Sequence, residues 1–441
     1  MNKRIAIVLL PVFWPNLPPI GAASLKAFLG GRSIPADALD YNNYFFNRVS
    51  DDLKAKWRVS CNDAFEENIV DTLRAGYARE VSLMIGKLLQ YDIAGFSCHR
   101  SNFPTVKEIA GILKKERPGI EIVFGGPEIA RRYFKNGRGL PEELKGLADL
   151  FVVGEGELPL YRFVQGDRPD EGIAAFCELK DLKALPAPDY SDFDPGSYPK
   201  KSSMSLNFSR GCVRRCGFCS ERLLYKGFRA RQPASVVDEI KRHRKKGIGH
   251  FIFHDSLING DLEGLEGLFD GMLGDAGPVS WEAQIAVRSD MPDELFKKMK
   301  RSGCVHLFVG LESGCDRTLA RMDKGFNKAD ALEFFGRLKK HDLSFGVSII
   351  TGFPGESKED FEEGLDFIVE NKDVIRKIEQ VNPFVYYDGT DLPETADYRY
   401  RAEPLGRARV FIDRIKAEGI RHTAAFTLNL VEKQCLYQNF T

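Results

Sequence analysis

The chain has no excess of either charge. Its 63 lysines and arginines equal its 63 aspartates and glutamates, so it lacks the global positive field that draws a protein to nucleic acid, and it has no acidic tail. It also has no apolar stretch of ~18 residues, the length that a membrane-spanning helix needs. No internal sequence repeat is present. We therefore expect no nucleic-acid partner and no membrane span.

Cysteine is sparse and scattered. Nine cysteines occur in 441 residues, and several stand alone in apolar or charged segments, which excludes a disulfide framework and favours a reducing cytoplasm. The first ten residues begin like a signal peptide. Their apolar run ends in prolines between residues 11 and 19, however, without a small-residue cleavage site. We interpret this run as a buried strand.

The length allows two or three domains. In residues 1–165, apolar runs of strand length alternate with helical patterns, which indicates a doubly wound parallel sheet with helices on both faces. A mainly helical insertion fills residues 44–89. Expected strands are 5–10, 91–98, 120–124 and 150–153, and expected helices are 21–29 and 105–117.

Ligands of a doubly wound sheet bind outside the carboxyl ends of its strands. Glycines at these ends let the backbone approach a large ligand, although a simple turn requirement explains each glycine almost as well. His99 lies in one of these loops and could be a surface or substrate residue. The candidate binding residues at these ends are Ser97, Gly125, Gly126, Pro127, Gly154 and Glu155.

Residues 166–200 are rich in Asp, Pro and Gly and are predicted to form a linker. In residues 201–395, six strand-like runs alternate with helical stretches, which predicts a partial (β/α)6 TIM-type barrel with its reaction centre at the strand C-termini. Residues 396–441 form a short C-terminal tail. The expected strands are 204–208, 250–254, 280–285, 305–311, 344–350 and 380–387.

Cys212, Cys216 and Cys219 stand in the loop after the first of these strands. Three thiolates at this spacing can hold three corners of a 4Fe-4S cluster, and no fourth cysteine is near to close the last corner, so one iron stays open. The alternative is a structural zinc site, which usually needs a second ligand pair that is absent here. Arginines in this run, such as Arg214, are expected to lower the pKa values of the thiolates.

The Cys-x-x-x-Cys-x-x-Cys pattern, with Phe218 before the third cysteine, resembles the signature of the radical S-adenosylmethionine (radical SAM) family. The resemblance implies that the three cysteines bind a catalytic 4Fe-4S cluster. Its open iron would bind S-adenosylmethionine, which would be cleaved to methionine and a 5′-deoxyadenosyl radical. Phe218 would lie against the adenine.

The resemblance also implies roles for residues at the other strand ends. His254 or Asp255 would serve the methionine ammonium group. Arg288, as a cation, suits the methionine carboxylate, and Gln284 suits the ribose. The stretch around Glu312 is similar to the family's Gly-x-Glu-Ser-Gly, whose acid contacts S-adenosylmethionine, although by position alone this acid reads as a helix cap or ion-pair partner. Gly352 would allow the adenine to approach.

Residues 1–165 also resemble the cobalamin-binding domain that precedes many radical SAM domains. Four segments carry this resemblance: the apolar strand with its Pro-rich loop, the strand that ends at Ser97, the turn at residues 124–127, and residues 153–157. The resemblance implies bound cobalamin. The Asp-x-His-x-x-Gly motif that supplies a histidine to cobalt in the methionine synthase type is missing from the first loop, and some relatives have lost the cofactor.

Together these features predict a cytoplasmic radical SAM enzyme that is similar to the class B methyltransferases and methylates an unactivated carbon with the help of cobalamin. A small molecule or peptide would be the substrate, and a flavodoxin or ferredoxin the electron donor. One alternative is radical cyclisation, rearrangement or coupling, with or without cobalamin. The other is a metal-binding protein without catalysis.

Overall fold

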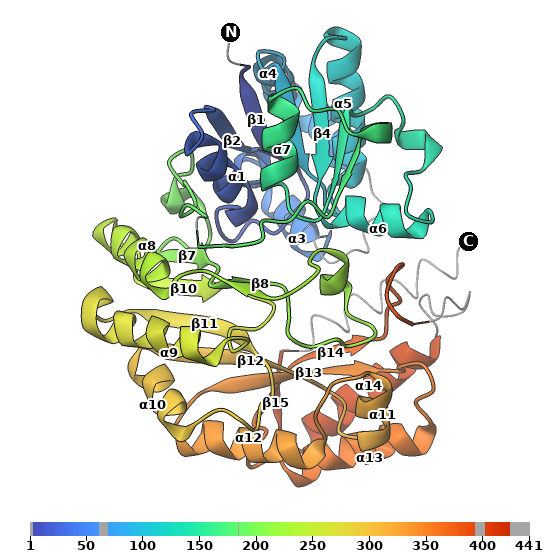
Figure 1. The fold of residues 1–441 in the computed structure, drawn as a ribbon. Helices are drawn as coiled ribbons and strands as arrows, with labels where there is room; N and C mark the ends of the chain where they lie inside the picture. Colours follow the sequence, from blue (N-terminus) through green and yellow to red (C-terminus); the bar gives the residue numbers. More distant parts are fainter. Residues whose placement is uncertain (1–2, 61–68, 184, 393–401, 424–441) are drawn as a thin grey trace. The chain divides into compact units, whose positions relative to one another are not determined.

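The computed structural model describes residues 3–60, 69–183, 185–392 and 402–423 (Figure 1). The chain forms two compact units. The first contains residues 1–205 and 223–226, and the second contains residues 206–222 and 227–441.

The first unit is built on a parallel sheet of six strands in the order β2-β1-β3-β4-β5-β6. The central strands are continuous apolar runs, and every residue of β1 and β5 is buried, as expected for a sheet covered on both faces. The strands are β1 (Ile5–Leu9), β2 (Ala36–Asp40), β3 (Ile93–Ser97), β4 (Glu121–Gly125), β5 (Leu150–Val153) and β6 (Ile173–Ala175).

Helices cover both faces of this sheet (Figure 1). α1 packs beside α7, and α4 packs beside α5. The helices are α1 (Ile20–Gly30), α2 (Tyr41–Phe46), α3 (Asp51–Ser60), α4 (Ile69–Leu88), α5 (Phe103–Glu116), α6 (Pro127–Lys135) and α7 (Glu157–Val164), with short helical turns η1 (Glu142–Leu144), η2 (Asp170–Gly172) and η3 (Pro195–Ser197).

The predicted doubly wound sheet is confirmed, and two of its strands had not been expected. β2 reads Ala-Asp-Ala-Leu-Asp and has too few apolar residues to be recognised as a buried strand. β6 has three residues and lies in the segment interpreted as a linker, where it pairs with β5. The linker therefore begins later than predicted.

A second sheet has seven strands in the order β15-β14-β13-β12-β11-β10-β7, of which β10 to β15 belong to the second unit and pair in parallel. All six predicted strands are present, and β15 was not foreseen. The strands are β7 (Ser203–Leu206), β10 (His250–Phe253), β11 (Ser280–Ile285), β12 (Cys304–Glu312), β13 (Phe345–Thr351), β14 (Lys377–Pro383) and β15 (Arg421–His422). A small antiparallel pair joins β8 (Ser209–Arg210) to β9 (Arg229–Ala230).

Helices cover the outer face of this second sheet. On β11, Trp281 stacks on Phe269 of α9 at 5.3 Å between ring centroids. Because side chains alternate along a strand, Gln284 points to the opposite, inner face. The helices are α8 (Pro233–Lys245), α9 (Leu262–Gly271), α10 (Asp293–Arg301), α11 (Asp316–Arg321), α12 (Lys328–Lys340), α13 (Lys358–Glu370) and α14 (Ala402–Ala417), with turns η4 (Ser220–Leu223) and η5 (Met272–Ala276).

In the described part of the chain, no helix has both the length and the apolar character needed to cross a membrane.

Candidate functional site

The three cysteines of the motif line one cavity of about 240 Å³ in the second unit. The cavity lies at the C-terminal ends of the barrel strands, where barrel chemistry takes place. Its lining consists of Cys212, Arg214, Cys216, Phe218, Cys219, Glu221, His254, Asp255, Ser256, Leu257, Gln284, Ile285, Ala286, Val287, Phe308, Gly310, Glu312, Lys324 and Phe326.

Arg214 ties the cysteine loop to its surroundings. Its guanidinium donates to the carbonyl oxygens of Val287 at 2.6 Å and Gly325 at 2.9 Å. Within the same loop, the Gly217 N–H donates to the Met322 carbonyl at 3.1 Å. These bonds hold the loop against the end of β11 and against the turn after α11, so the loop is shaped by the protein itself.

Asp255 fixes the start of the same loop. Its carboxylate accepts hydrogen bonds from the backbone N–H of Phe208 at 3.1 Å, from the backbone N–H of Ser209, and from the Ser209 hydroxyl at 2.5 Å. Burial raises the pKa of Asp255 to about 6, although these donors and Arg231 oppose the shift. The carboxyl group lines the cavity, but most of its hydrogen-bonding capacity serves the loop.

The thiols are more basic than the sequence suggested. Burial raises the pKa of all three, to about 12 for Cys219, and the cations nearby do not outweigh it. Arg214 does lower the pKa of Cys216, as expected, but desolvation is the larger effect and the net shift of each thiol pKa is upward. A metal centre must displace three protons to bind here.

The donor set fits a cluster with one open corner. Three sulfur ligands face one cavity, and in the described part of the chain no fourth cysteine lines it. Cys98, Cys177, Cys304 and Cys315 lie elsewhere, while residues 61 and 435 lie outside the described residues.

Glu312 and Lys324 form a buried pair in the lining of the same cavity. The ammonium of Lys324 lies 3.5 Å from one oxygen of Glu312, and the Ser348 hydroxyl donates to the other oxygen at 2.9 Å. Lys324 is 8% exposed, and its Nζ lies 5.8 Å from the ring centroid of Phe218 and 5.6 Å from that of Phe326. The cavity thus contains a cation with a single, loosely held acidic partner.

Phe218 joins an aromatic cluster beside the cavity. Its ring packs edge-on against Phe353, with 6.1 Å between centroids, and Phe353 packs in the same way against Phe384 at 5.2 Å. These contacts hold the ring of Phe218 against an apolar wall, while in the chain Phe218 stands between two of the cysteine ligands. A flat ligand ring can pack against such a surface.

The structure brings His254 and Gln284 into the cavity lining, and both side chains are exposed. It does not bring Arg288 there. The guanidinium of Arg288 binds both carboxylate oxygens of Asp290, at 2.8 and 2.6 Å, and also donates to the Asn259 carbonyl. A carboxylate two residues along the chain therefore occupies the cation that was predicted to bind the methionine carboxylate.

Gly352 also lies outside this cavity. It has a φ of +70°, and a Cβ atom there would lie 2.6 Å from the ring of Pro404. It lines a second, smaller cavity together with Arg407. The close approach for which this glycine is needed is to Pro404 of α14, so the predicted adenine contact does not fit its position.

The candidate binding residues of the first unit lie together at one edge of its sheet. Ser97 ends β3 and pairs in register with Gly125 at the end of β4. Gly126, at a φ of 103°, leaves room for the backbone of Cys98, since a Cβ would lie 2.7 Å from the Cys98 carbonyl oxygen. Gly154 follows β5 with a φ of 98°.

Two further candidates at this edge have structural contacts. Pro127 is the first residue of α6, and Glu155 is buried and accepts a hydrogen bond from the Leu179 N–H at 3.0 Å. The latter contact reaches the segment after β6.

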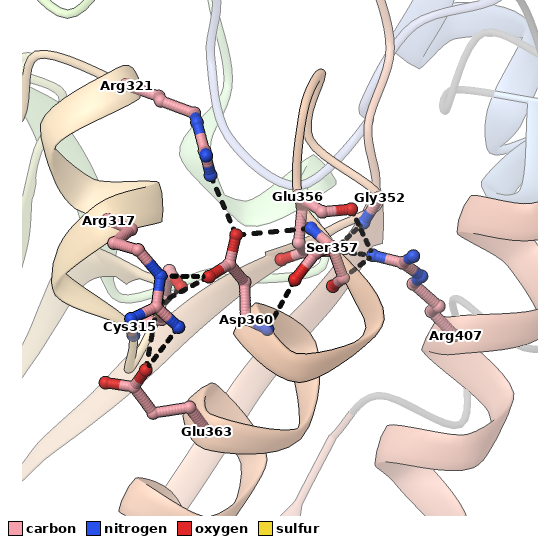
Figure 2. Close-up of polar contacts among 10 residues, drawn as sticks. Cys315, Arg317, Arg321, Gly352, Glu356, Ser357, Asp360, Glu363 and Arg407 are labelled. Atoms are coloured by element: carbon pink, nitrogen blue, oxygen red, sulfur yellow. Dashed lines mark hydrogen bonds and ion pairs between the residues drawn. The ribbon is translucent and has the colours of Figure 1, made fainter.

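An ion-pair network holds α11 against α13 (Figure 2). The turn that bears Lys324 follows α11 in the chain. Asp360 on α13 accepts from Arg317 and, at 2.8 Å, from Arg321. The thiol of Cys315 lies 3.4 Å from Glu363 and 3.6 Å from Asp360. These three residues are close enough to share a metal ion, but both carboxylates already bind arginine or lysine. We assign them a structural role.

Residues 206–368 match the family described as the radical SAM superfamily, and this stretch contains all the residues of the cysteine-lined cavity. Residues 206–368 therefore form a radical SAM domain. The family predicted from the cysteine motif is thus confirmed, and a radical SAM domain uses a 4Fe-4S cluster and S-adenosylmethionine.

Several curated proteins resemble the radical SAM chain. It is 28% identical over 262 residues to the bacteriochlorophyllide d C-12(1)-methyltransferase of Chlorobaculum tepidum, covering 54% of this chain and 56% of that protein. It is 27% identical over 245 residues to the ribosomal protein uS12 methylthiotransferase RimO of Pseudothermotoga lettingae, covering 52% and 56%. The chain therefore spans little more than half the length of these relatives.

Solved structures confirm the predicted fold class. The radical SAM chain matches the cobalamin-dependent S-adenosylmethionine radical enzyme OxsB with a TM-score of 0.64 at 16% identity, covering 98% of this chain and 56% of that one. It matches the methyltransferase TsrM from Kitasatospora setae, solved with cobalamin and a [4Fe-4S] cluster, with a TM-score of 0.63 at 16% identity, covering 93% and 85%.

Sequence reasoning gave no ligand-binding role to Arg214, Lys324, Phe308 or Phe326, which line the cavity. The signal for Lys324 was weak, because it lies in the turn between α11 and α12 and not at the end of a strand. Its burial beside Glu312 depends on the tertiary fold.

Proposed function

We propose that the chain is a radical SAM enzyme that methylates an unactivated carbon of a small molecule or peptide with the help of cobalamin. The observation that carries the proposal is one cavity lined both by three thiol ligands and by a buried lysine–glutamate pair. When bound there, a reduced 4Fe-4S cluster supplies the electron that splits S-adenosylmethionine into methionine and a 5′-deoxyadenosyl radical.

Different residues of the cavity bind the cluster and the separate parts of S-adenosylmethionine. Cys212, Cys216 and Cys219 hold the cluster, and Phe218 packs against the adenine. Lys324 takes the methionine carboxylate in place of Arg288. Its ammonium lies as far as 3.5 Å from the carboxylate of Glu312, so this ion pair is weak and leaves the cation able to bind a second carboxylate. His254 and Gln284 contact the ammonium or ribose, and the surrounding apolar wall excludes water from the radical.

Cobalamin is proposed for the first unit. A doubly wound sheet, glycines at the ends of β4 and β5, and a fold shared with OxsB and TsrM support this assignment. Bound there, cobalamin would supply the methyl group. An electron donor such as flavodoxin or ferredoxin completes the system, and we place the enzyme in the reducing cytoplasm.

The test uses the full chain, produced with cobalamin, purified without oxygen and reconstituted with iron and sulfide. With S-adenosylmethionine and a reductant it should release 5′-deoxyadenosine, and with cobalamin also S-adenosylhomocysteine, the product of methyl donation. About one zinc per chain without iron would overturn the enzyme assignment. 5′-Deoxyadenosine without bound cobalamin or S-adenosylhomocysteine would leave a radical enzyme of the cyclising, rearranging or coupling kind.

A further inference from the structure

A second cavity in the second unit lies at the same strand ends as the cysteine-lined one. Gly352 follows β13 and Phe384 follows β14, and the Phe384 N–H donates to the Thr351 carbonyl at 2.9 Å. Both residues line the cavity, and so does Pro404 of α14. Because barrel chemistry takes place at the C-terminal ends of the strands, this cavity lies on the side of the barrel where a substrate meets the radical.

Aromatic rings connect this cavity to the cysteine-lined one. Phe353 lines the smaller cavity, and its ring packs on that of Phe218, which lines the larger one, with 6.1 Å between the ring centroids. Phe384 packs on Phe353 in turn, at 5.2 Å. A molecule anchored in the smaller cavity is therefore held near the ring that we assign to the adenine.

A buried carboxylate lines the smaller cavity. The Glu356 side chain is 3% exposed, and its Oε2 accepts from the Gly352 N–H at 2.8 Å and from the Arg407 guanidinium at 2.7 Å (Figure 2). Within the described ranges, its Oε1 accepts no hydrogen bond. Burial raises the pKa of Glu356, because desolvation outweighs the attraction of Arg407. A hydrogen-bond donor in the cavity would stabilise this second oxygen.

The guanidinium in the cavity lining is already bound. Arg407 donates to the carboxylate and the carbonyl of Glu356, to the Ser357 carbonyl at 3.3 Å and to the Glu403 carboxylate at 2.5 Å. Two carboxylates in the lining thus share one guanidinium, which leaves one negative charge in excess. The rings of Phe353 and Phe384 add surfaces that attract a cation. This chemistry favours an ammonium group over a carboxylate or a phosphate.

The cavity admits a head group and not a whole substrate. Its volume of about 90 Å³ equals that of roughly three water molecules in the liquid. An ammonium group with the first carbons of its chain fills this space. The rest of the substrate must extend out of the cavity, which leaves its other carbons free to reach the radical.

We infer that this cavity binds a primary ammonium group of the substrate, with Glu356 as its acceptor and Phe353 and Phe384 as its aromatic walls. The inference rests on the proposed function, since it assigns the cavity to the substrate of that enzyme. The ammonium group donates to the free Oε1 of Glu356, and no covalent bond is made or broken. The substrate is then an amine that is anchored by its nitrogen and methylated at a carbon.

Saturation-transfer NMR of the full chain tests the inference without turnover. The probes are n-butylammonium and 1-butanol, its neutral counterpart of similar shape, and we expect saturable binding of butylammonium and much weaker binding of butanol. Glu356→Gln keeps an acceptor for the Gly352 N–H but lacks the charge, so butylammonium should bind roughly 10-fold more weakly. Equal butylammonium affinity in this variant and the wild type, or equal affinity of the wild type for both probes, overturns the inference.

Two further variants complete the experiment. Glu362→Gln removes the same charge from an exposed position of α13 and should bind butylammonium like the wild type; a loss as large as in Glu356→Gln would be a general charge effect and would overturn the inference. If Glu356→Gln does not fold, Phe384→Leu decides. It removes one aromatic wall, so butylammonium should bind several-fold more weakly while butanol is unaffected, and unchanged butylammonium binding overturns the inference.

The binding assay also separates this inference from the proposed function. A wild-type protein without saturable butylammonium binding overturns the ammonium site and leaves the radical SAM methylation proposal standing. A wild-type protein that binds butylammonium but releases no 5′-deoxyadenosine after cluster reconstitution overturns the proposed function and leaves the ammonium site standing.

Discussion

Lys324 and Glu312 meet over a residue that has no side chain. A Cβ atom on Gly310 would lie 2.5 Å from a carboxylate oxygen of Glu312 and 3.4 Å from the ammonium of Lys324. The pair thus occupies the space that a side chain on β12 would fill. This arrangement puts a cation and an acid within reach of the same ligand.

Replacing Lys324 should weaken S-adenosylmethionine binding. In Lys324→Met the methionine carboxylate loses its cation, and the loss of one charge-assisted hydrogen bond should raise Kd roughly 10- to 100-fold. Equilibrium dialysis with the cluster-loaded protein measures this. Lys324→Arg should recover part of the affinity.

The matched control for this prediction is Arg288→Met. Because Asp290 already binds that guanidinium, its loss should change the affinity little. A large loss in Arg288→Met together with normal binding in Lys324→Met would reverse the two roles.

Removing one cysteine of the motif should abolish radical chemistry. Cys216→Ala leaves two thiols in the cavity, too few to hold a cluster that binds S-adenosylmethionine at its open iron. Iron and sulfide content should fall, and 5′-deoxyadenosine should disappear. Cys177→Ser, which changes a cysteine of the first unit, should leave both unchanged. Normal 5′-deoxyadenosine release from Cys216→Ala contradicts the assignment.

Asp360 should be a stability hot spot of the second unit. Its buried carboxylate binds Arg317 and Arg321 and accepts the hydrogen bond of the Ser357 N–H (Figure 2). Burial opposes ionisation, but the two arginines hold the pKa of Asp360 below its ordinary value. Asp360→Asn removes the charge from both pairs, and because both arginines are largely exposed it should cost about 1–2 kcal/mol.

Thermal unfolding measures that cost. Glu362→Gln on the same helix removes one exposed ion pair with Lys358, so its melting temperature should stay close to that of the wild type. Equal melting temperatures for Asp360→Asn and the wild type would show that the network adds nothing.

Stability should also fall in mild acid because of His243. Burial lowers the pKa of His243 from 6.5 to about 4, with help from Lys246 and Arg242. Between these values the unfolded chain binds a proton that the folded chain does not, so stability is retained above pH 6.5 and lost as pH falls toward 4. The cost should be about 1 kcal/mol between pH 7.5 and 5.5.

His243→Gln should flatten this part of the pH dependence in denaturant unfolding of the second unit. The comparison is between the slopes of variant and wild type, because other histidines contribute equally to both. Identical slopes would mean that His243 does not carry the effect.

Local sequence patterns were sufficient for the cysteine loop and for most strands. Cys212, Cys216 and Cys219 are close together in the chain, so their spacing alone indicates which metal centre they can bind. Fully apolar runs such as β1 and β5 are recognised as buried strands from the sequence. β6 was not predicted, because three residues between Asp- and Pro-rich segments are too few to show the alternation of a strand.

The roles of two cations, Arg288 and Lys324, depend on their ion-pair partners. Arg288 follows a barrel strand as a ligand-binding cation should, yet Asp290 captures it. Lys324 follows a short helix and reaches the cavity because α11 is bound to α13. The first pair is local and was overlooked in the sequence, whereas the pair between Arg321 and Asp360 joins segments far apart in the chain and cannot be read from spacing.

The bonds of Arg214 to the carbonyls of Val287 and Gly325 have a consequence for how the enzyme matures. A small zinc domain spends much of its metal affinity on folding its own chain. Here the two guanidinium bonds of Arg214 go to backbone carbonyls and need no metal, so part of the loop's shape comes from the fold and not from a cluster. The three thiols would then exchange their protons for iron at positions that Arg214 helps to set.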